Sequence, residues 1–84
     1  PVTQLRSLMP PREAAVRRCV GPAWFGTVTV GFRATGDGVV REATVRGSLA
    51  GTAAAACIEA ALKAEGVPRF AARTQRFDWT WTLR

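Results

Sequence analysis

The chain has 84 residues, a formal net charge of +6 and a hydrophobic fraction of 48%. A chain of this length can bury one small core, which excludes a second domain. It contains no apolar run near the roughly 20 residues that cross a bilayer. The positive charge would suggest nucleic acid, anionic lipid or an acidic partner, but eleven of the twelve basic residues are arginine. That bias is typical of a GC-rich genome, so we interpret most of the charge as solvated surface.

The N-terminal residues carry little hydrophobic pattern. The sequence starts with Pro1 instead of Met and has no signal-peptide pattern, so we expect a piece of a longer protein. Residues 1–9 would be the end of a linker, and residues 10–84 would form the single domain.

A helix is expected after Pro10-Pro11, since proline is tolerated in a first helical turn. Val16, Cys19 and Val20 recur at intervals of three and four residues and form one apolar stripe. Gly21-Pro22 ends this helix. We expect the aromatic residues that follow, Trp24 and Phe25, to enter the core.

Two strands are expected next. Residues 27–35 alternate, with the apolar members on one face: Val28, Val30, Phe32 and Ala34. A Gly-Asp-Gly turn at 36–38 predicts a hairpin. In the returning strand, Val40, Ala43 and Val45 cannot share a face at a strict period of two. This slip predicts a β-bulge near Arg41 and Glu42.

The strongest helix pattern lies between Thr52, a candidate N-cap, and Gly66, a candidate C-cap. Pro68 prevents the helix from continuing. The chain then ends on RFDWTWTLR, which alternates as a strand with one apolar face. Its apolar residues are Phe77, Trp79, Trp81 and Leu83, and its polar residues are Arg76, Asp78, Thr80 and Thr82.

The order helix, strand, strand, helix, strand predicts a two-layer α+β domain with both helices on one face of a three-stranded antiparallel or mixed sheet. The helical crossover makes the third strand parallel to the second. Its unstrained place is beside the first strand, antiparallel to it. The predicted sheet order is 2-1-3, which leaves the last strand at an edge.

Cys19 and Cys57 are the two cysteines, and the chain has no histidine. Their spacing excludes CxxC redox chemistry, and two thiolates alone cannot complete a tetrahedral zinc site. Both lie on the predicted inward stripes of their helices. Either a disulfide or two buried thiols would fit, and a disulfide would indicate an oxidising compartment.

The residue types do not support an enzyme. There is no histidine or tyrosine, the six carboxylates fall mostly on predicted helical surface or turns, and the glycines form no phosphate-binding motif. We therefore expect a binding or structural domain without cofactor or metal.

The motifs and cysteines follow a particular order. Cys19 precedes G-x-V-x-V-x-F, formed by Gly26, Val28, Val30 and Phe32. G-x-V-x-x-A-x-V-x-x-S follows, formed by Gly38, Val40, Ala43, Val45 and Ser48. Cys57-Ile58 then lies in an alanine-rich helix before the closing strand. This order, over about residues 12–84, resembles the AgmX/PglI C-terminal domain, a branch of the TonB C-terminal-like domains found in myxobacterial envelope and gliding-motility proteins.

The resemblance implies a periplasmic domain at the end of a linker anchored in the inner membrane. It implies a TonB-box-like segment of an outer-membrane or periplasmic protein as the partner, added as a strand beside the last strand of the domain. It further implies energy transduction from an inner-membrane motor that acts through the upstream region, with gliding motility as the process served.

Two function classes follow. The first is partner binding at the open edge of the last strand, residues Arg76, Phe77, Asp78, Trp79, Thr80, Trp81, Thr82 and Leu83. The alternative is a small basic nucleic-acid-binding domain, which requires Trp79 and Trp81 on the open sheet face. We rank it lower, because the aromatic RNP motif is absent and these indoles are expected under the helices. A strand-exchanged homodimer through the same edge is compatible with the first class.

Overall fold

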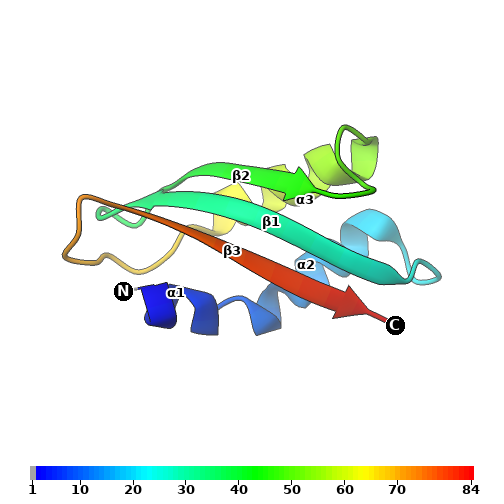
Figure 1. The fold of residues 1–84 in the computed structure, drawn as a ribbon, viewed down its shortest axis with the longest axis horizontal. Coiled ribbons are helices and arrows are strands. Elements are labelled where there is room, and N and C mark those ends of the chain that lie inside the picture. The colour runs from blue at the N-terminus through cyan, green and yellow to red at the C-terminus, as the bar shows by residue number, and fades with distance from the viewer. Residues whose placement is uncertain (1) are drawn as a thin grey trace.

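The computed structural model describes residues 2–84, which form one antiparallel sheet with helices against one face (Figure 1). In chain order, the elements are α1 (Val2–Ser7), the 3-10 helix η1 (Pro10–Arg12), α2 (Glu13–Val20), β1 (Gly26–Thr35), β2 (Val40–Arg46), α3 (Ala53–Glu65) and β3 (Thr74–Leu83). The strand order is β2-β1-β3, and β1 runs antiparallel to both neighbours. The predicted fold class and strand order are therefore confirmed. None of the helices within residues 2–84 has the length and apolar character to cross a membrane.

The core lies between the sheet and the helices. Alternation puts one face of each strand inward, and the inward side chains of β1 and β3 are almost fully buried: Val28, Val30, Phe32, Ala34, Phe77, Trp81 and Leu83. Phe32 and Phe77 are paired across the two strands and stack with ring centroids 4.8 Å apart. Ile58 and Leu62 of α3 and Val16 of α2 close the core from the helical layer.

The predicted bulge lies in β2. Arg33 pairs with Glu42, whereas the next residue of β1, Ala34, pairs with Val40. Arg41 is the extra residue, because it has no partner in this register. Two residues on one strand therefore oppose one on the other, which shifts the phase of the alternation. This shift is why Val40 is buried on the same side as Ala43 and Val45.

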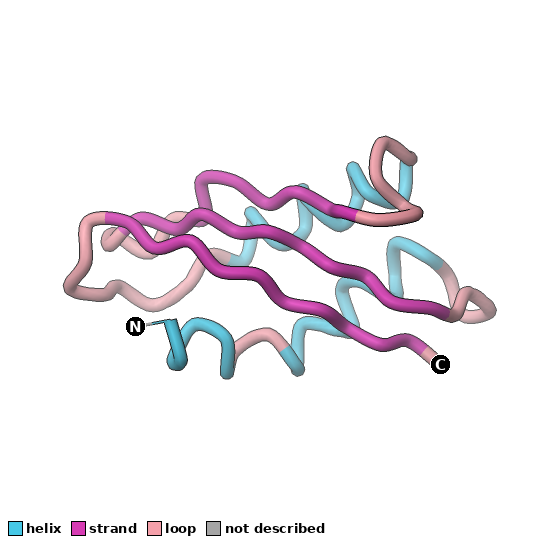
Figure 2. Tube along the Cα trace, viewed as in Figure 1, coloured by secondary structure: helices cyan, strands magenta, loops and turns pink. Residues whose placement is uncertain are grey.

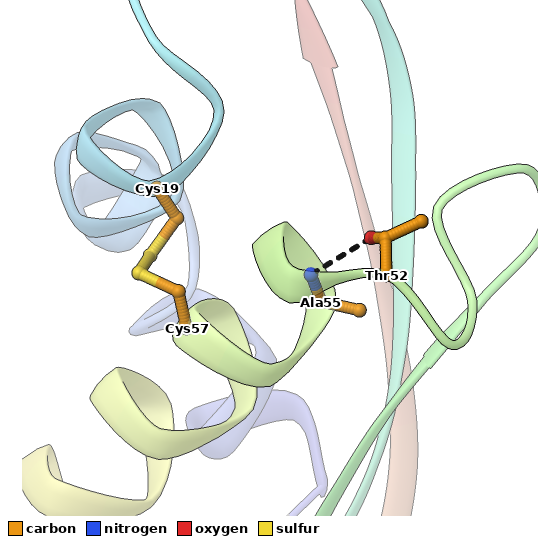
Figure 3. Close-up of a disulfide and its surroundings, with 4 residues drawn as sticks. All are labelled: Cys19, Thr52, Ala55 and Cys57. Carbon is orange, nitrogen blue, oxygen red and sulfur yellow. Dashed lines mark hydrogen bonds between the residues drawn. A yellow bond between two sulfur atoms is a disulfide. The ribbon is translucent and has the colours of Figure 1, made fainter.

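The ends of α3 are as expected. The Thr52 hydroxyl accepts a hydrogen bond from the backbone N–H of Ala55 at 3.1 Å, which satisfies one of the free amides of the first turn (Figure 3). Gly66 follows the last turn at φ 64°. The segment after it docks on the β1–β2 turn, at the end of the molecule where β3 begins (Figure 2).

Backbone hydrogen bonds attach the segment between α3 and β3 to the β1–β2 turn. The N–H of Gly36 donates to the carbonyl of Arg73 at 3.1 Å, and the N–H of Phe70 donates to the carbonyl of Gly36 at 3.0 Å. The Ala72 carbonyl lies where a side chain at position 36 would begin, so this close approach requires glycine. β3 therefore enters the sheet already aligned with β1.

Cys19 and Cys57 form a disulfide that links α2 to α3, with an S–S distance of 2.09 Å (Figure 3). The expected inward position of Cys57 is wrong, since Cys57 is exposed and Cys19 is half-buried. The inner face of α3 consists of Ala55, Ile58 and Leu62, so its neighbour Cys57 is rotated to the rim of the helix pair. The bond clamps the two helices from outside the core.

Residues 2–9 have more structure than an ending linker. They form α1 and the turn after it, and Leu5 and Met9 are 3% and 0% exposed within the core. These two residues are four apart in the sequence, a spacing typical of one helical face, and both point into the core although α1 itself ends at Ser7. In Figure 1, α1 lies alongside β3, and the two elements are in contact.

The expectation for the aromatic pair after α2 is half wrong. Trp24 is partly buried and packs against the core, but Phe25 is 78% exposed. Arg17 fixes this loop by donating to the carbonyl oxygens of Gly21 and Trp24. With the backbone held there, only Trp24 reaches the core.

Candidate functional site at the free edge of β3

β3 has β1 on one side and no strand on the other. The N–H of Gly36 donates to the Arg73 carbonyl on the β3 side, whereas the N–H of Thr35 donates to the Val39 carbonyl on the β2 side. Backbone groups alternate in direction along a strand, so even-numbered residues of β1 bond to β3. Their partners in the register are the odd-numbered residues of β3. The even-numbered residues therefore direct their backbone N–H and C=O groups outward: Arg76, Asp78, Thr80 and Thr82.

The side chains of β3 divide as the alternation predicts. Phe77, Trp81 and Leu83 are buried on the helix side, and Trp79 is half-buried on the same side. The polar residues Arg76, Asp78, Thr80 and Thr82 are exposed on the open face. Trp79 and Trp81 do not form the open aromatic surface that the nucleic-acid alternative requires.

Ion pairs cross the open face and tie the outer strands together. Glu42 of β2 lies 3.4 Å from Arg33 and 3.6 Å from Arg76. Arg46 of β2 reaches Asp78 of β3 at 3.2 Å, so this pair spans the whole sheet. These side chains are exposed apart from the half-buried Arg33, so each pair contributes no more than about 1 kcal/mol.

The long reach of Arg46 depends on Gly31. A side chain at this central position would begin 2.7 Å from Nη2 of Arg46. Glycine therefore leaves the space through which the guanidinium crosses β1 to Asp78.

The opposite edge of the sheet is capped at one position. The N–H of Val45, which points away from β1, donates to a carboxylate oxygen of Glu59 at 2.8 Å. Glu59 belongs to α3, which packs along β2 (Figure 1). A satisfied amide and an adjacent helix reduce the capacity of an edge to pair with another chain.

The β3 edge is protected over only part of its length. The Gln75 side chain donates to the Arg76 carbonyl at 2.9 Å. Within residues 2–84, no hydrogen bond reaches the outward backbone groups of Asp78, Thr80 or Thr82. This stretch is the candidate template for an added strand.

α1 borders this open stretch without bonding to its backbone. The indole Nε1 of Trp81 donates to the carbonyl of Met9 at 2.8 Å, which anchors the end of the α1 segment below the sheet. The guanidinium of Arg6 lies 5.4 Å from the centre of the Trp79 ring. A groove of about 240 Å³ lies beside the edge, lined by Arg6, Asp78, Trp79 and Thr80.

The alternation of residues 76–83 predicted the β3 part of this site, whereas no expected element contained Arg6 or Met9. Both fall in the segment assigned to a linker. The spacing of Leu5 and Met9 was the one signal that a helix could extend the domain toward the N-terminus.

Arg17 holds the far end of β3. Its guanidinium donates to the carbonyl of Arg84 at 3.1 Å, in addition to its bonds with the loop after α2. The two ends of β3 are therefore fixed by different contacts. Backbone hydrogen bonds of Gly36 with Phe70 and Arg73 hold its start, and Arg17 holds its end. A rigid strand is a suitable template because little ordering is required when a partner binds.

The pKa of one carboxyl group, that of Asp37, departs clearly from its usual value. Hydrogen bonding by the Thr35 hydroxyl, together with the Val39 amide and the charge of Arg41, lowers the pKa of Asp37 below its usual range. Asp37 lies in the β1–β2 turn, so these contacts support the hairpin. In the part of the chain that the structure covers, no group of three or more His, Cys, Asp or Glu side chains could hold a metal ion.

No family model matches this chain, and neither a curated protein nor a solved structure is significantly similar to it. The resemblance to the AgmX/PglI C-terminal domain therefore rests on the sequence pattern.

Proposed function

We propose that this domain is the periplasmic, partner-binding end of an envelope-spanning TonB-like protein. It binds an extended segment of an outer-membrane or periplasmic protein by strand addition along β3. The upstream region connects it to an inner-membrane motor, and the assembly transmits force or tethers the two membranes, with gliding motility as the process served.

The difference between the two sheet edges is the observation that carries this proposal. On β2, the outward N–H of Val45 is bonded to Glu59, and α3 packs along the strand. On β3, the outward groups from Asp78 to Thr82 have no hydrogen-bond partner within residues 2–84. Strand addition takes its affinity from such unpaired main-chain groups.

The disulfide supports the proposed periplasmic location. Disulfides persist in oxidising compartments, of which the bacterial periplasm is one, and are rare in the cytosol. The Cys19–Cys57 bond, which also fixes α2 against α3, fits such a location.

The position of α1 supports force transmission. In this proposal, the upstream region would attach through α1, which is anchored to β3 by the hydrogen bond from Trp81 to Met9. The same strand would hold the partner. Tension between the upstream region and the partner would therefore pass through a short path that avoids most of the core.

A proline at Thr80 tests the proposal. The N–H of Thr80 points outward, so Thr80→Pro removes an amide from the edge and leaves the bonds between β3 and β1 in place. Peptides that tile candidate outer-membrane and periplasmic partners would be titrated into the labelled domain and followed by NMR. We expect shifts along residues 76–83 in the wild type and at least about tenfold weaker binding to Thr80→Pro.

Thr80→Val is the matched control. It removes the hydroxyl that bonds to Thr29 at 2.8 Å but keeps the backbone amide, so it should bind as the wild type does. Shifts confined to the helices, or unchanged binding to Thr80→Pro, would contradict strand addition. Sedimentation at increasing protein concentration distinguishes a homodimer through the same edge, since only self-pairing depends on the concentration of the domain.

A further inference from the structure

Arg6 differs from the arginines within the strands. Its guanidinium lies over the Trp79 ring, an arrangement that favours a cation at a fixed position. Within residues 2–84, no carboxylate pairs with it. Five other arginines do have carboxylate partners: Arg12, Arg33, Arg41, Arg46 and Arg76. Arg6 is therefore a positioned cation whose charge the domain leaves uncompensated.

The place of Arg6 coincides with the open part of the edge. The groove of about 240 Å³ that Arg6 borders is lined on the β3 side by Asp78, Trp79 and Thr80. A strand added along this stretch would direct every second side chain toward the helix side of the sheet. There it would meet the half-buried indole of Trp79 and the guanidinium of Arg6.

The other charge in the groove does not cancel this preference. The carboxylate of Asp78 lies on the open face and is paired with Arg46 at 3.2 Å. Arg76 lies near the same edge but is itself paired with Glu42 at 3.6 Å, so it adds no uncompensated charge there. With a net charge of +6, the whole chain also attracts anionic partners over a distance.

We infer that the strand bound at the β3 edge is acidic and that one of its carboxylates, on the helix side, pairs with Arg6. This inference rests on the proposed strand addition and specifies its partner chemistry. Arg6 then selects the partner and its register, because only a strand with an acidic residue at the matching position completes the pair.

The test begins with a displayed library of random heptapeptides, selected against the wild-type domain at low salt. The tightest binder is synthesised with its acidic residue and with the corresponding amide. Fluorescence anisotropy then gives Kd for both peptides with the wild type, Arg6→Gln and Arg18→Gln. Arg18 is a matched control because it is an exposed arginine on α2.

We expect the amide peptide to bind the wild type and Arg18→Gln about two- to fivefold more weakly than the acidic peptide, as for an exposed ion pair. With Arg6→Gln, the two peptides should bind within experimental error of each other. The wild-type preference should also decline as salt is raised, because the pair is solvent-exposed.

Two results would overturn this inference while strand addition stands. In one, the selected peptides are neutral and lose affinity for Thr80→Pro. In the other, Arg6→Gln keeps the full preference for the acidic peptide. If the peptides bind Thr80→Pro as tightly as the wild type, they occupy another surface, and the proposed function fails together with the inference.

Discussion

The carboxylate of Glu59 in α3 accepts a hydrogen bond from the backbone N–H of Val45, at the outer edge of β2, over 2.8 Å. Glu59 therefore caps one outward amide of the β2 edge, and no described residue does the same for the outward amides of Asp78, Thr80 or Thr82 in β3. The two edges differ in this respect.

Removing the Glu59 carboxylate should weaken the fold and open the second edge. We expect Glu59→Ala to cost about 1 to 2 kcal/mol of unfolding free energy, because a partly buried amide loses its acceptor. Glu59→Gln retains an acceptor oxygen and should cost less. Urea denaturation measures both, and equal losses would show that the hydrogen bond is not what Glu59 contributes.

The bond from Trp81 to Met9 should anchor α1. Trp81→Phe removes the indole donor and leaves a buried carbonyl unpaired, which should cost about 1 to 3 kcal/mol. Hydrogen exchange should become faster in residues 2–9. Trp24→Phe is the control, since Trp24 is a partly buried tryptophan whose indole makes no hydrogen bond within residues 2–84, and faster exchange of residues 2–9 in both variants would argue against the anchor.

The disulfide should supply a large part of the stability. Cys19 and Cys57 are separated by 38 positions, and closing a loop of that length contributes about 3 to 4 kcal/mol in the chain-entropy model. The double variant Cys19→Ala, Cys57→Ala should lose about this amount in urea denaturation. Reduction of the wild type should give a similar loss, because Cys57 is exposed to the reductant.

Two glycines in β1 and its turn should respond differently to alanine. At Gly31, the new methyl group meets the mobile end of Arg46, so Gly31→Ala should change stability by less than about 1 kcal/mol while breaking the pair with Asp78. At Gly36, it meets the fixed carbonyl of Ala72, so Gly36→Ala should cost about 1 to 3 kcal/mol. Thermal unfolding measures the stability of both variants. A larger loss of stability for Gly31→Ala than for Gly36→Ala would contradict these expectations.

The β1–β2 turn should weaken in acid. The pKa of Asp37 is lowered in the folded state, chiefly by the Thr35 hydroxyl, so the ionised form stabilises the fold. This contribution is complete above the pKa of the unfolded chain, near pH 4, and is lost as the pH falls through the lower folded value. Asp37→Asn should lack this dependence. Unfolding of both proteins between pH 6 and pH 2 measures the difference, which would be absent if the turn contacts were unimportant.

The sequence by itself determined the elements whose causes are local. The alternation of β1 and β3, the cap at Thr52, the glycine after α3 and the phase slip that predicts the bulge at Arg41 are all readable from neighbouring residues. The sheet order followed as well, because a helical crossover returns the last strand beside the first. The assignment of Phe77, Trp79, Trp81 and Leu83 to the helix side came from the same alternation.

Tertiary structure decided what depends on residues distant in the chain. How the helices are rotated and placed against the sheet decides several contacts. Among them are the hydrogen bond from Val45 to Glu59 and the one from Trp81 to Met9. The same placement decides that Cys57 and Phe25 are exposed. No local pattern encodes these rotations, since they are set by the combined packing of all the layers. The sequence therefore indicated that β3 would lie at an edge, but only the packed molecule decided that the outward groups of Asp78, Thr80 and Thr82 are left without internal partners and that Arg6 lies beside them.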